Sequence, residues 1–133
     1  MTGTTGRTQQ PARAGLSVGE AARAAGVSID TLRYYEREQL LRTDRTASGH
    51  RRYSTRDLDW IGVLTCLRET GMPIRRMREF ALLVGADDDA TVGARIGLLE
   101  AHREQVRQRI GELEGNLAHV EGKITWYRDR LRG

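Results

Sequence analysis

The residues that decide the fold read Ser28-Ile-Asp-Thr-Leu-Arg-Tyr-Tyr-Glu-Arg-Glu-Gln-Leu-Leu41 and continue through Arg42 to Arg51-Arg52-Tyr53. Ser28 is a favourable N-cap, and Asp30 lies near the positive end of the helix that it begins. The sequence therefore predicts a short capped helix whose arginines and tyrosines project outward, followed by a basic hairpin rich in turn residues.

A second short helix is predicted immediately before this one. Ser17 and Glu20 have the spacing of a capping box, and Gly26 stands where a left-handed residue ends a helix. The apolar residues between them fall on one face, and they are Val18, Ala21, Ala22 and Ala25. Two short helices joined by a glycine-containing turn are typical of the helix-turn-helix motif, although any small helical domain can contain such a pair.

The second helix of this pair is expected to bury one face and to expose the other. Its inward residues are predicted to be Ile29, Leu32 and Tyr35 or Glu36, while Asp30, Thr31, Arg33, Tyr34 and Arg37 project elsewhere. In a recognition helix the first residues reach base edges, and arginines and tyrosines beyond them hold phosphates. We expect one of the two tyrosines to lie in the core and the other to contact the DNA backbone. The alternative is that both are partly buried aromatics.

A two-stranded wing is predicted for the segment that follows. Asp44, Ser48 and Gly49 are turn formers between Leu41 and the Arg51–Tyr53 run. Cations would come from Arg45, His50, Arg51 and Arg52, and Tyr53 would anchor the hairpin to the helices. A basic loop is often only a solvated loop, but here it directly follows a helix-turn-helix. The residues predicted to bind DNA are Ser17, Ser28, Asp30, Thr31, Arg33, Tyr34, Arg45, His50, Arg51, Arg52 and Tyr53.

With these residues in view, the chain resembles the MerR family of bacterial transcription regulators. The resemblance lies in Leu32-Arg-Tyr-Tyr-Glu36, Leu40-Leu41, Gly49-His-Arg-Arg-Tyr53 and Asp57-Leu58, and it covers about residues 16–85. These motifs are specific in combination, since few other families place such an arginine–aromatic pair and a Gly-x-Arg-Arg-Tyr wing at this separation. The resemblance implies a mainly α-helical protein with a winged helix-turn-helix DNA-binding domain, a helical linker and a long C-terminal dimerisation helix.

Two further helices are expected to form core and linker. Ser54 and Asp57 form another capping box, which begins a third helix that runs to about Thr70 and ends at Gly71. Its apolar face is predicted to hold Leu58, Ile61, Val63, Leu64 and Leu67, with Trp60 adjacent. Pro73 is expected to begin a fourth helix whose packing residues are Ile74, Met77, Phe80, Ala81 and Val84. Three arginines lie near its start, and they are Arg75, Arg76 and Arg78. The resemblance implies that they contact the DNA backbone, and a solvated face is an equal alternative.

A heptad repeat extends from about Thr91 to the C-terminal end. One set of positions holds Ile96, Ile110, Leu117, Ile124 and Leu131, and the other holds Val92, Leu99, Val106, Leu113, Val120 and Tyr127, with Arg103 as the one break. A long helix with a narrow apolar seam needs a partner, which predicts a homodimeric coiled coil. The dimerisation residues are predicted to be Ile96, Leu99, Val106, Ile110, Leu113, Leu117, Val120, Ile124, Tyr127 and Leu131. The flanking charges leave the strand direction open, and the family resemblance implies an antiparallel pair.

Cys66 is the candidate for effector sensing. It lies near Arg68 and the Arg75–Arg76 pair in the sequence, and neighbouring cations favour a reactive thiolate. The run Leu64-Thr-Cys-Leu-Arg68 resembles the single-cysteine branch of the family that responds to aldehydes, electrophiles or thiol stress. The alternative is that Cys66 is a small buried filler. His102 and His119 are too far apart on the predicted helix to chelate a metal together.

Charge is distributed unevenly along the 133-residue chain, whose net charge is +4. Residues 1–56 carry 10 Lys+Arg and 5 Asp+Glu, residues 57–90 carry 4 and 7, and residues 91–133 carry 8 and 6. The basic excess therefore lies in the N-terminal part, where a polyanion would bind. An ordinary solvated surface is the alternative.

Several classes of protein are excluded by composition. A single cysteine excludes an internal disulfide and a multi-cysteine metal site, and no apolar run of about 18 residues is present to span a membrane. The first 15 residues lack the apolar segment of a secretory signal, which predicts a cytoplasmic protein. Acid–base pairs, nucleophile–base pairs and phosphate loops at meaningful spacing are absent. We therefore expect neither an enzyme nor a cofactor-binding or metal-binding protein.

Four segments are predicted: a disordered tail at 1–15, a DNA-binding domain with two following helices at 16–85, an acidic loop at 86–90 and a coiled-coil helix at 91–133. Together they predict a homodimeric regulator that binds double-stranded promoter DNA in a sequence-specific manner. By resemblance it distorts promoter elements that are spaced too far apart for RNA polymerase. The competing hypothesis is a coiled-coil adaptor or architectural protein without effector sensing.

Overall fold

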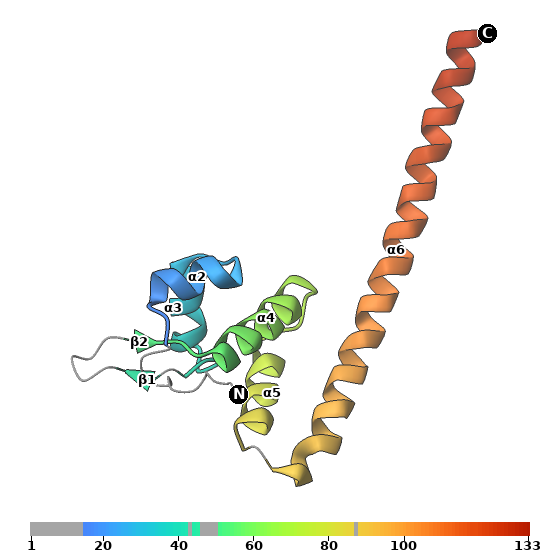
Figure 1. The fold of residues 1–133 in the computed structure, drawn as a ribbon. Helices are drawn as coiled ribbons and strands as arrows, with labels where there is room; N and C mark the ends of the chain where they lie inside the picture. The colour runs from blue at the N-terminus through green and yellow to red at the C-terminus, as the bar shows by residue number, and fades with distance from the viewer. Residues whose placement is uncertain (1–14, 43, 46–50, 87) are drawn as a thin grey trace, which may run out of the picture. The chain divides into compact units, whose positions relative to one another are not determined.

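The computed structural model describes residues 15–42, 44–45, 51–86 and 88–133, which form two separate units. The N-terminal unit contains α2 (Val18–Ala25), α3 (Ile29–Arg37), β1 (Asp44–Arg45), β2 (Arg51–Arg52), α4 (Thr55–Glu69) and α5 (Ile74–Ala86). The C-terminal unit contains the 3-10 turn η1 (Asp89–Thr91) and the long helix α6 (Val92–Arg132) (Figure 1). The predicted mainly helical class with a long C-terminal helix is confirmed. The predicted tail at 1–15 lies outside the described residues apart from Gly15.

The helix-turn-helix forms because its helix ends are satisfied locally. Ser17 and Glu20 make both bonds of a capping box, and Gly26 ends α2 in the left-handed region at φ 72°. The backbone N–H of Val27 then donates to the Ala22 carbonyl over 3.0 Å. Ser28 caps α3 by accepting a hydrogen bond from the Thr31 N–H (3.0 Å). The caps predicted from the sequence are therefore confirmed.

A short strand pair follows α3. β1 and β2 are antiparallel, with Asp44 opposite Arg52 and Arg45 opposite Arg51. Beyond β2, Tyr53 and Leu16 exchange two backbone hydrogen bonds of 2.7 and 2.9 Å, so the chain entering α2 lies beside the chain leaving the strands. The turn formers Ser48 and Gly49 lie outside the described residues. The wing therefore stays a prediction beyond its two-stranded base.

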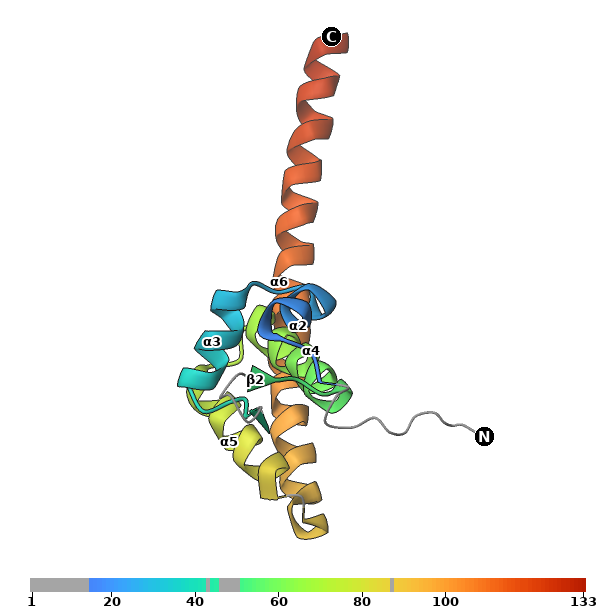
Figure 2. The same ribbon diagram turned by 60° about the vertical axis from the view of Figure 1, so that its left-hand side comes forward.

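The core of the N-terminal unit gathers apolar residues from every helix. The buried residues are Ala21, Ala22, Leu32, Tyr35, Leu40, Leu41, Tyr53, Ile61, Leu64, Leu67, Met72, Met77 and Phe80. Figure 2 shows α2, α3, α4 and α5 from a second direction. The prediction that Val63 belongs to the apolar face is wrong, because its side chain is 40% exposed. Two residues along a helix from the buried Ile61, Val63 projects from nearly the opposite side.

Two boundaries also differ from those predicted. Pro73 precedes α5 rather than starting it, and its carbonyl accepts the first helical hydrogen bond from the Met77 N–H (3.0 Å). At the other end α5 continues to Ala86, one residue into the predicted loop. Asp88 then caps η1, with its side chain accepting from the Ala90 N–H over 3.0 Å. Residue 87 lies outside the described residues.

The C-terminal unit is dominated by one uninterrupted helix. α6 has 41 residues, which gives a length of about 60 Å at 1.5 Å per residue. Its heptad residues are largely exposed, including Ile110, Leu117 and Val120. In the part of the chain that the structure describes, no helix is long and apolar enough to cross a membrane.

Candidate nucleic-acid interface

The exposed face of α3 carries the residues predicted to meet bases. Asp30 and Arg33 are exposed, and Thr31 is half-buried. The hydroxyls of Ser28 and Thr31 share a hydrogen bond of 2.9 Å, and the Ser28 hydroxyl also caps the helix. These two side chains are thus held by the N-terminal turn of α3, while Asp30 and Arg33 remain turned toward solvent.

Tyr34 and Tyr35 occupy different environments. Tyr35 is fully buried, and its hydroxyl shares a hydrogen bond of 3.0 Å with the Thr65 hydroxyl of α4. Tyr34 is half-buried, and its ring centroid lies 6.1 Å from that of Tyr35. Tyr35 is therefore the core tyrosine of the pair, and Tyr34 remains the candidate for contact with a DNA backbone.

Two arginines lie close to the Tyr34 ring. The guanidinium carbon of Arg37 lies 6.0 Å from the ring centroid, and that of Arg68 lies 5.5 Å from it. Both distances fit cation–π contacts. Tyr34, Arg37 and Arg68 are called the Tyr34 cluster below. It brings two exposed cations and a phenol together, and this combination of groups is suited to hold phosphates.

The predicted DNA-binding set included neither Arg37 nor Arg68. Arg37 follows Tyr34 by three residues, so helical spacing alone points to contact between them. Arg68 comes from α4 and is 34 residues further along the chain than Tyr34, and no local pattern links such distant residues. Only the fold brings Arg68 to the recognition helix.

Tyr53 lies in the core although the predicted DNA-binding set included it. Its side chain is 1% exposed, and its hydroxyl donates to Glu36 Oε2 over 2.7 Å. The residue therefore joins the end of β2 to α3, which is the anchoring role that the sequence also predicted. We assign Tyr53 to positioning the interface rather than to contacting DNA.

The basic residues around the strands are described only in part. Arg52 is half-buried, and its Nη1 donates to the Gly15 carbonyl over 3.2 Å. For Arg45 and Arg51 the structure describes the backbone pairing, and His50 lies outside the described residues. Their predicted contacts with DNA stay predictions.

The capping box of α2 lowers the pKa of the Glu20 carboxyl group. The Ser17 backbone N–H donates to Glu20 Oε1 over 2.9 Å, and this bond is the largest cause that lowers the pKa of the carboxyl group. The Ser17 side chain and the nearby charges of Arg52 and Arg23 lower this pKa further. The capping box of α2 thus holds a carboxylate close to Arg52.

Two of the three arginines at the start of α5 have acidic partners. Arg78 pairs with the carboxylate of Glu38 at the end of α3, and its Nε also donates to the Glu38 carbonyl over 3.3 Å. Arg76 pairs with Glu79 over 3.8 Å. The Arg78 pair makes α5 a support for the C-terminal end of the recognition helix.

Cys66, the predicted sensor residue, is exposed on α4. Its carbonyl accepts a hydrogen bond of 2.7 Å from the Thr70 hydroxyl. The interpretation of Cys66 as a buried filler is therefore wrong. Among the described residues, no group of three histidine, cysteine or acidic side chains is placed to hold a metal ion.

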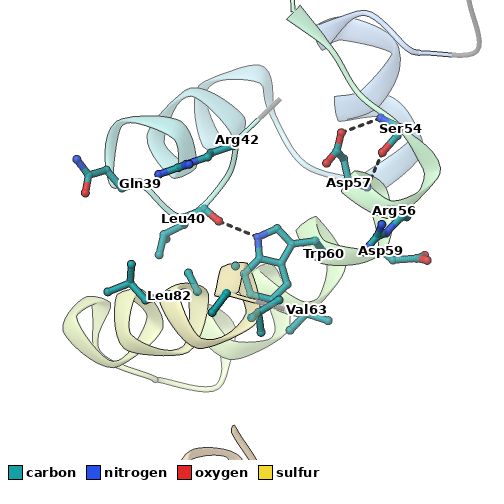
Figure 3. A pocket seen from close by; sticks show the side chains of 14 residues that line it. Gln39, Leu40, Arg42, Ser54, Arg56, Asp57, Asp59, Trp60, Val63 and Leu82 are labelled. Atoms are coloured by element: carbon teal, nitrogen blue, oxygen red, sulfur yellow. Dashed lines mark hydrogen bonds between the residues drawn. The ribbon is translucent and has the colours of Figure 1, made fainter. Parts of the chain in front are cut away.

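A groove of about 870 Å³ lies where the beginning of α4 meets the end of α5 (Figure 3). Its lining includes Trp60, Val63 and Leu82, with Asp59 and Arg42 among the polar residues. The Trp60 Nε1–H donates to the Leu40 carbonyl over 2.7 Å, and its ring stacks on Phe80 at 5.7 Å. Among the described residues, this lining and the predicted DNA-binding set do not overlap.

The chain is similar to known regulatory proteins that contain a helix-turn-helix. Residues 16–82 match the model of the MerR HTH family regulatory protein. An uncharacterized HTH-type transcriptional regulator of Haemophilus influenzae is 37% identical over 109 residues, which cover 81% of this chain and 80% of that protein. The transcriptional regulator AdhR of Bacillus subtilis is 34% identical over 92 residues, which cover 68% of this chain and 65% of AdhR.

A solved structure extends the similarity over most of the chain. It is the crystal structure of HiNmlR, a MerR family regulator lacking the sensor domain, bound to promoter DNA. The TM-score is 0.78 at 34% identity, and the match covers 86% of this chain and 91% of HiNmlR. These relatives are transcriptional regulators rather than enzymes. The chain therefore belongs to the MerR family of helix-turn-helix regulatory proteins.

Proposed function

We propose that this chain is a sequence-specific regulator that binds double-stranded promoter DNA through α3 and the Tyr34 cluster. The observation that carries the proposal is that Arg37 of α3 and Arg68 of α4 both lie at the Tyr34 ring, on the helix that also exposes Asp30 and Arg33. Asp30 and Arg33 would read base edges, and the cluster would hold the phosphate backbone. HiNmlR, which shares this fold and 34% identity, is bound to promoter DNA in its crystal structure.

The regulator acts as a homodimer in this proposal. The seam of α6 exposes apolar residues that a second copy would cover, among them Leu113, Leu117 and Ile124. A dimer brings two recognition helices to two half-sites of a near-palindromic operator. One helix contributes few base-reading residues, so doubling it is part of the recognition.

We further propose that the dimer distorts promoter DNA at which RNA polymerase binds, and membership of the family supports this. In this proposal the operator lies between promoter elements, and the dimer bends and untwists the DNA so that polymerase can engage both. Such a distortion costs on the order of a few kcal/mol, which added protein–DNA contacts must offset. The Tyr34 cluster and the wing arginines are the groups that would supply these contacts.

Response to aldehydes, electrophiles or thiol oxidants is proposed to act through Cys66. Its exposure on α4 supports this role, because a sensing thiol must be reached by the effector. Arg68 lies on the same helix, so a change at the thiol has a short route to the Tyr34 cluster. The test is a promoter reporter in cells carrying Cys66→Ser. An unchanged response to aldehydes and thiol oxidants would end this part of the proposal.

DNA binding is tested by selecting bound duplexes from a random pool and then measuring affinity by fluorescence anisotropy at several salt concentrations. Arg68→Ala is expected to weaken binding to all duplexes alike and to reduce the log–log salt slope by about 1. Arg33→Ala is expected to cost about 1–3 kcal/mol and to relax the selected sequence.

Arg132→Ala is the matched control, because it removes the same charge from an exposed residue at the C-terminal end of α6. It should leave the selected sequence and the affinity nearly unchanged. A wild-type affinity for duplex DNA that did not vary with salt would reject the proposal in favour of the coiled-coil adaptor.

A further inference from the structure

The helices α2, α3 and α4 each begin with a serine cap and carry an acidic residue in the first turn. In α2 and α4 this acidic residue is the third of the helix, and its carboxylate accepts a hydrogen bond from the backbone N–H of the capping serine. Glu20 accepts from Ser17 over 2.9 Å, and Asp57 accepts from Ser54 over 2.8 Å. In α3 the acidic residue is Asp30, which is the second of the helix. Asp30 therefore lacks the spacing that closes a capping box.

The cap of α3 is made without Asp30. The Ser28 hydroxyl accepts a hydrogen bond from the Thr31 N–H over 3.0 Å, and the two hydroxyls share another of 2.9 Å. The Asp30 side chain is exposed. Its carboxylate is therefore placed to accept hydrogen bonds from a molecule that approaches α3 from outside.

Asp30 lies on the side of α3 that points away from the core. Leu32 and Tyr35 mark the inward side, since both are fully buried. At 3.6 residues per turn, Asp30 lies about 140–160° around the helix axis from each of them and within about 20° of Arg37. Arg37 belongs to the Tyr34 cluster and lies about 10 Å further along the helix. Asp30 is thus at the N-terminal end of the outward face, the end that reaches base edges in a recognition helix.

A carboxylate at this place is selective for the bases that it can face. DNA phosphates repel it, so only a donor on a base edge can compensate for its approach. In the major groove guanine presents the acceptors N7 and O6, and thymine presents the acceptor O4 and a methyl group. Cytosine and adenine each present an amino group, but adenine also presents the acceptor N7 beside it. The carboxylate of Asp30 therefore favours cytosine.

We propose that Asp30 determines the operator specificity of this chain by accepting a hydrogen bond from the N4 amino group of one cytosine in each half-site. The inference rests on the proposed function and specifies one base of the operator. Rejection contributes as much as attraction, because guanine or thymine would place an acceptor against the carboxylate. The alternative is that Asp30 only stabilises the positive end of the α3 dipole, a role that does not depend on the DNA sequence.

Selection of bound duplexes from a random pool by the full chain tests the proposal. The natural chain is expected to enrich cytosine at one position of each half-site. Replacing that base pair in the selected duplex should weaken binding about 5- to 150-fold by fluorescence anisotropy.

Two substitutions of Asp30 separate base reading from helix stabilisation. Asp30→Asn is expected to select adenine at the same position, because an amide pairs with adenine N6 and N7 together. Asp30→Ala should lose the preference at that position and keep the rest of the selected site. Asp59→Asn is the matched control, because it makes the same change at an exposed carboxylate that lines the groove of Figure 3. It should select the same site as the natural chain.

The inference would be overturned if Asp30→Asn and Asp30→Ala both selected the same site as the natural chain. Asp30 would then act only on α3, and any loss of affinity would be equal for all duplexes. This failure differs from that of the proposed function, in which the natural chain itself would enrich no sequence.

Discussion

Gln39 ends α3 in the left-handed backbone region, at φ 63°, where glycine is the favoured residue. The Leu40 N–H donates to the Tyr35 carbonyl over 2.9 Å and the Gln39 N–H to the Glu36 carbonyl over 3.1 Å, the two bonds of a Schellman motif. A side chain in this region costs about 1–2 kcal/mol. Glycine would relieve this strain, but it loses more conformational entropy on folding, which offsets part of the gain. Gln39→Gly is therefore expected to stabilise the protein by about 0.5–1 kcal/mol.

Urea unfolding at fixed protein concentration measures this change. Gly26→Ala is the matched opposite substitution, because it adds a side chain at a residue with positive φ. Gly26 ends α2 at φ 72°, and no atom lies within 4 Å of the position of an added Cβ. It should destabilise by about 1 kcal/mol through backbone strain alone. Equal signs for the two substitutions would contradict this account of the caps.

Glu20 makes the stability of α2 depend on pH. Its pKa in the folded protein lies below the ordinary 4.5, first because the Ser17 N–H donates to the carboxylate. The carboxylate therefore contributes stability above about pH 4.5, and this contribution is lost as the pH falls through the lowered pKa.

Glu20→Gln keeps a hydrogen-bond acceptor but removes the charge. The stability advantage of the natural chain over this variant, measured by urea unfolding, should be present at pH 7 and shrink at about pH 3. An advantage that is the same at both pH values would contradict the prediction.

The residues predicted correctly from the sequence are those with partners close in the chain. Ser17, Ser28 and Ser54 each cap a helix through a residue three positions away, so spacing alone identifies them. The sequence predicts that Tyr53 both anchors the hairpin and binds DNA, and only the fold reveals that its hydroxyl reaches Glu36 from the core. The contact between Arg68 and Tyr34 depends on how α4 packs against α3, which no local pattern encodes.

At the scale of elements, Trp60 connects three segments of the N-terminal unit. Its indole N–H donates to the Leu40 carbonyl, and its ring stacks on Phe80 of α5. Trp60→Phe keeps an aromatic ring but leaves that carbonyl without its donor, so it should cost about 1–3 kcal/mol of unfolding free energy. The measurement is the urea midpoint of the full chain.

Trp126→Phe is the control for this substitution. Trp126 is 48% exposed on α6, and replacing it should change stability by no more than about 0.5 kcal/mol. If the Trp60 and Trp126 variants lost the same stability, the hydrogen bond to Leu40 would not be what holds α4 to the end of α3.

Helices were predicted more completely than strands because periodicity extends over many residues. The capping boxes and glycine ends located α2 and α4 to within about a residue. β1 and β2 have two residues each, too few for an alternating pattern, so only the turn formers between them predict their pairing. The apolar character of Val63 predicts a place on the buried face of α4, but the residue projects outward.

At the scale of the whole molecule, the proposed function links the exposed seam of α6 to the recognition helix α3. The apolar character of the seam is predictable from its heptads, whereas the flanking charges leave the direction of a partner helix open. A single helix-turn-helix holds few base-reading residues, so linked half-site binding should supply much of the affinity. Dimerisation and DNA binding are therefore expected to fail together.

Leu113→Glu combined with Leu117→Glu tests this coupling. The two carboxylates fall in the centre of the seam, where burial of unpaired charge opposes association. The variant should be monomeric by light scattering and should bind the selected operator about 10²- to 10⁴-fold more weakly than the natural chain. Gln108→Glu introduces one such carboxylate on the outer face of α6 and should change neither property. A monomeric variant that bound the operator with undiminished affinity would mean that one α3 suffices, and the seam would then serve a partner other than the DNA-bound second copy.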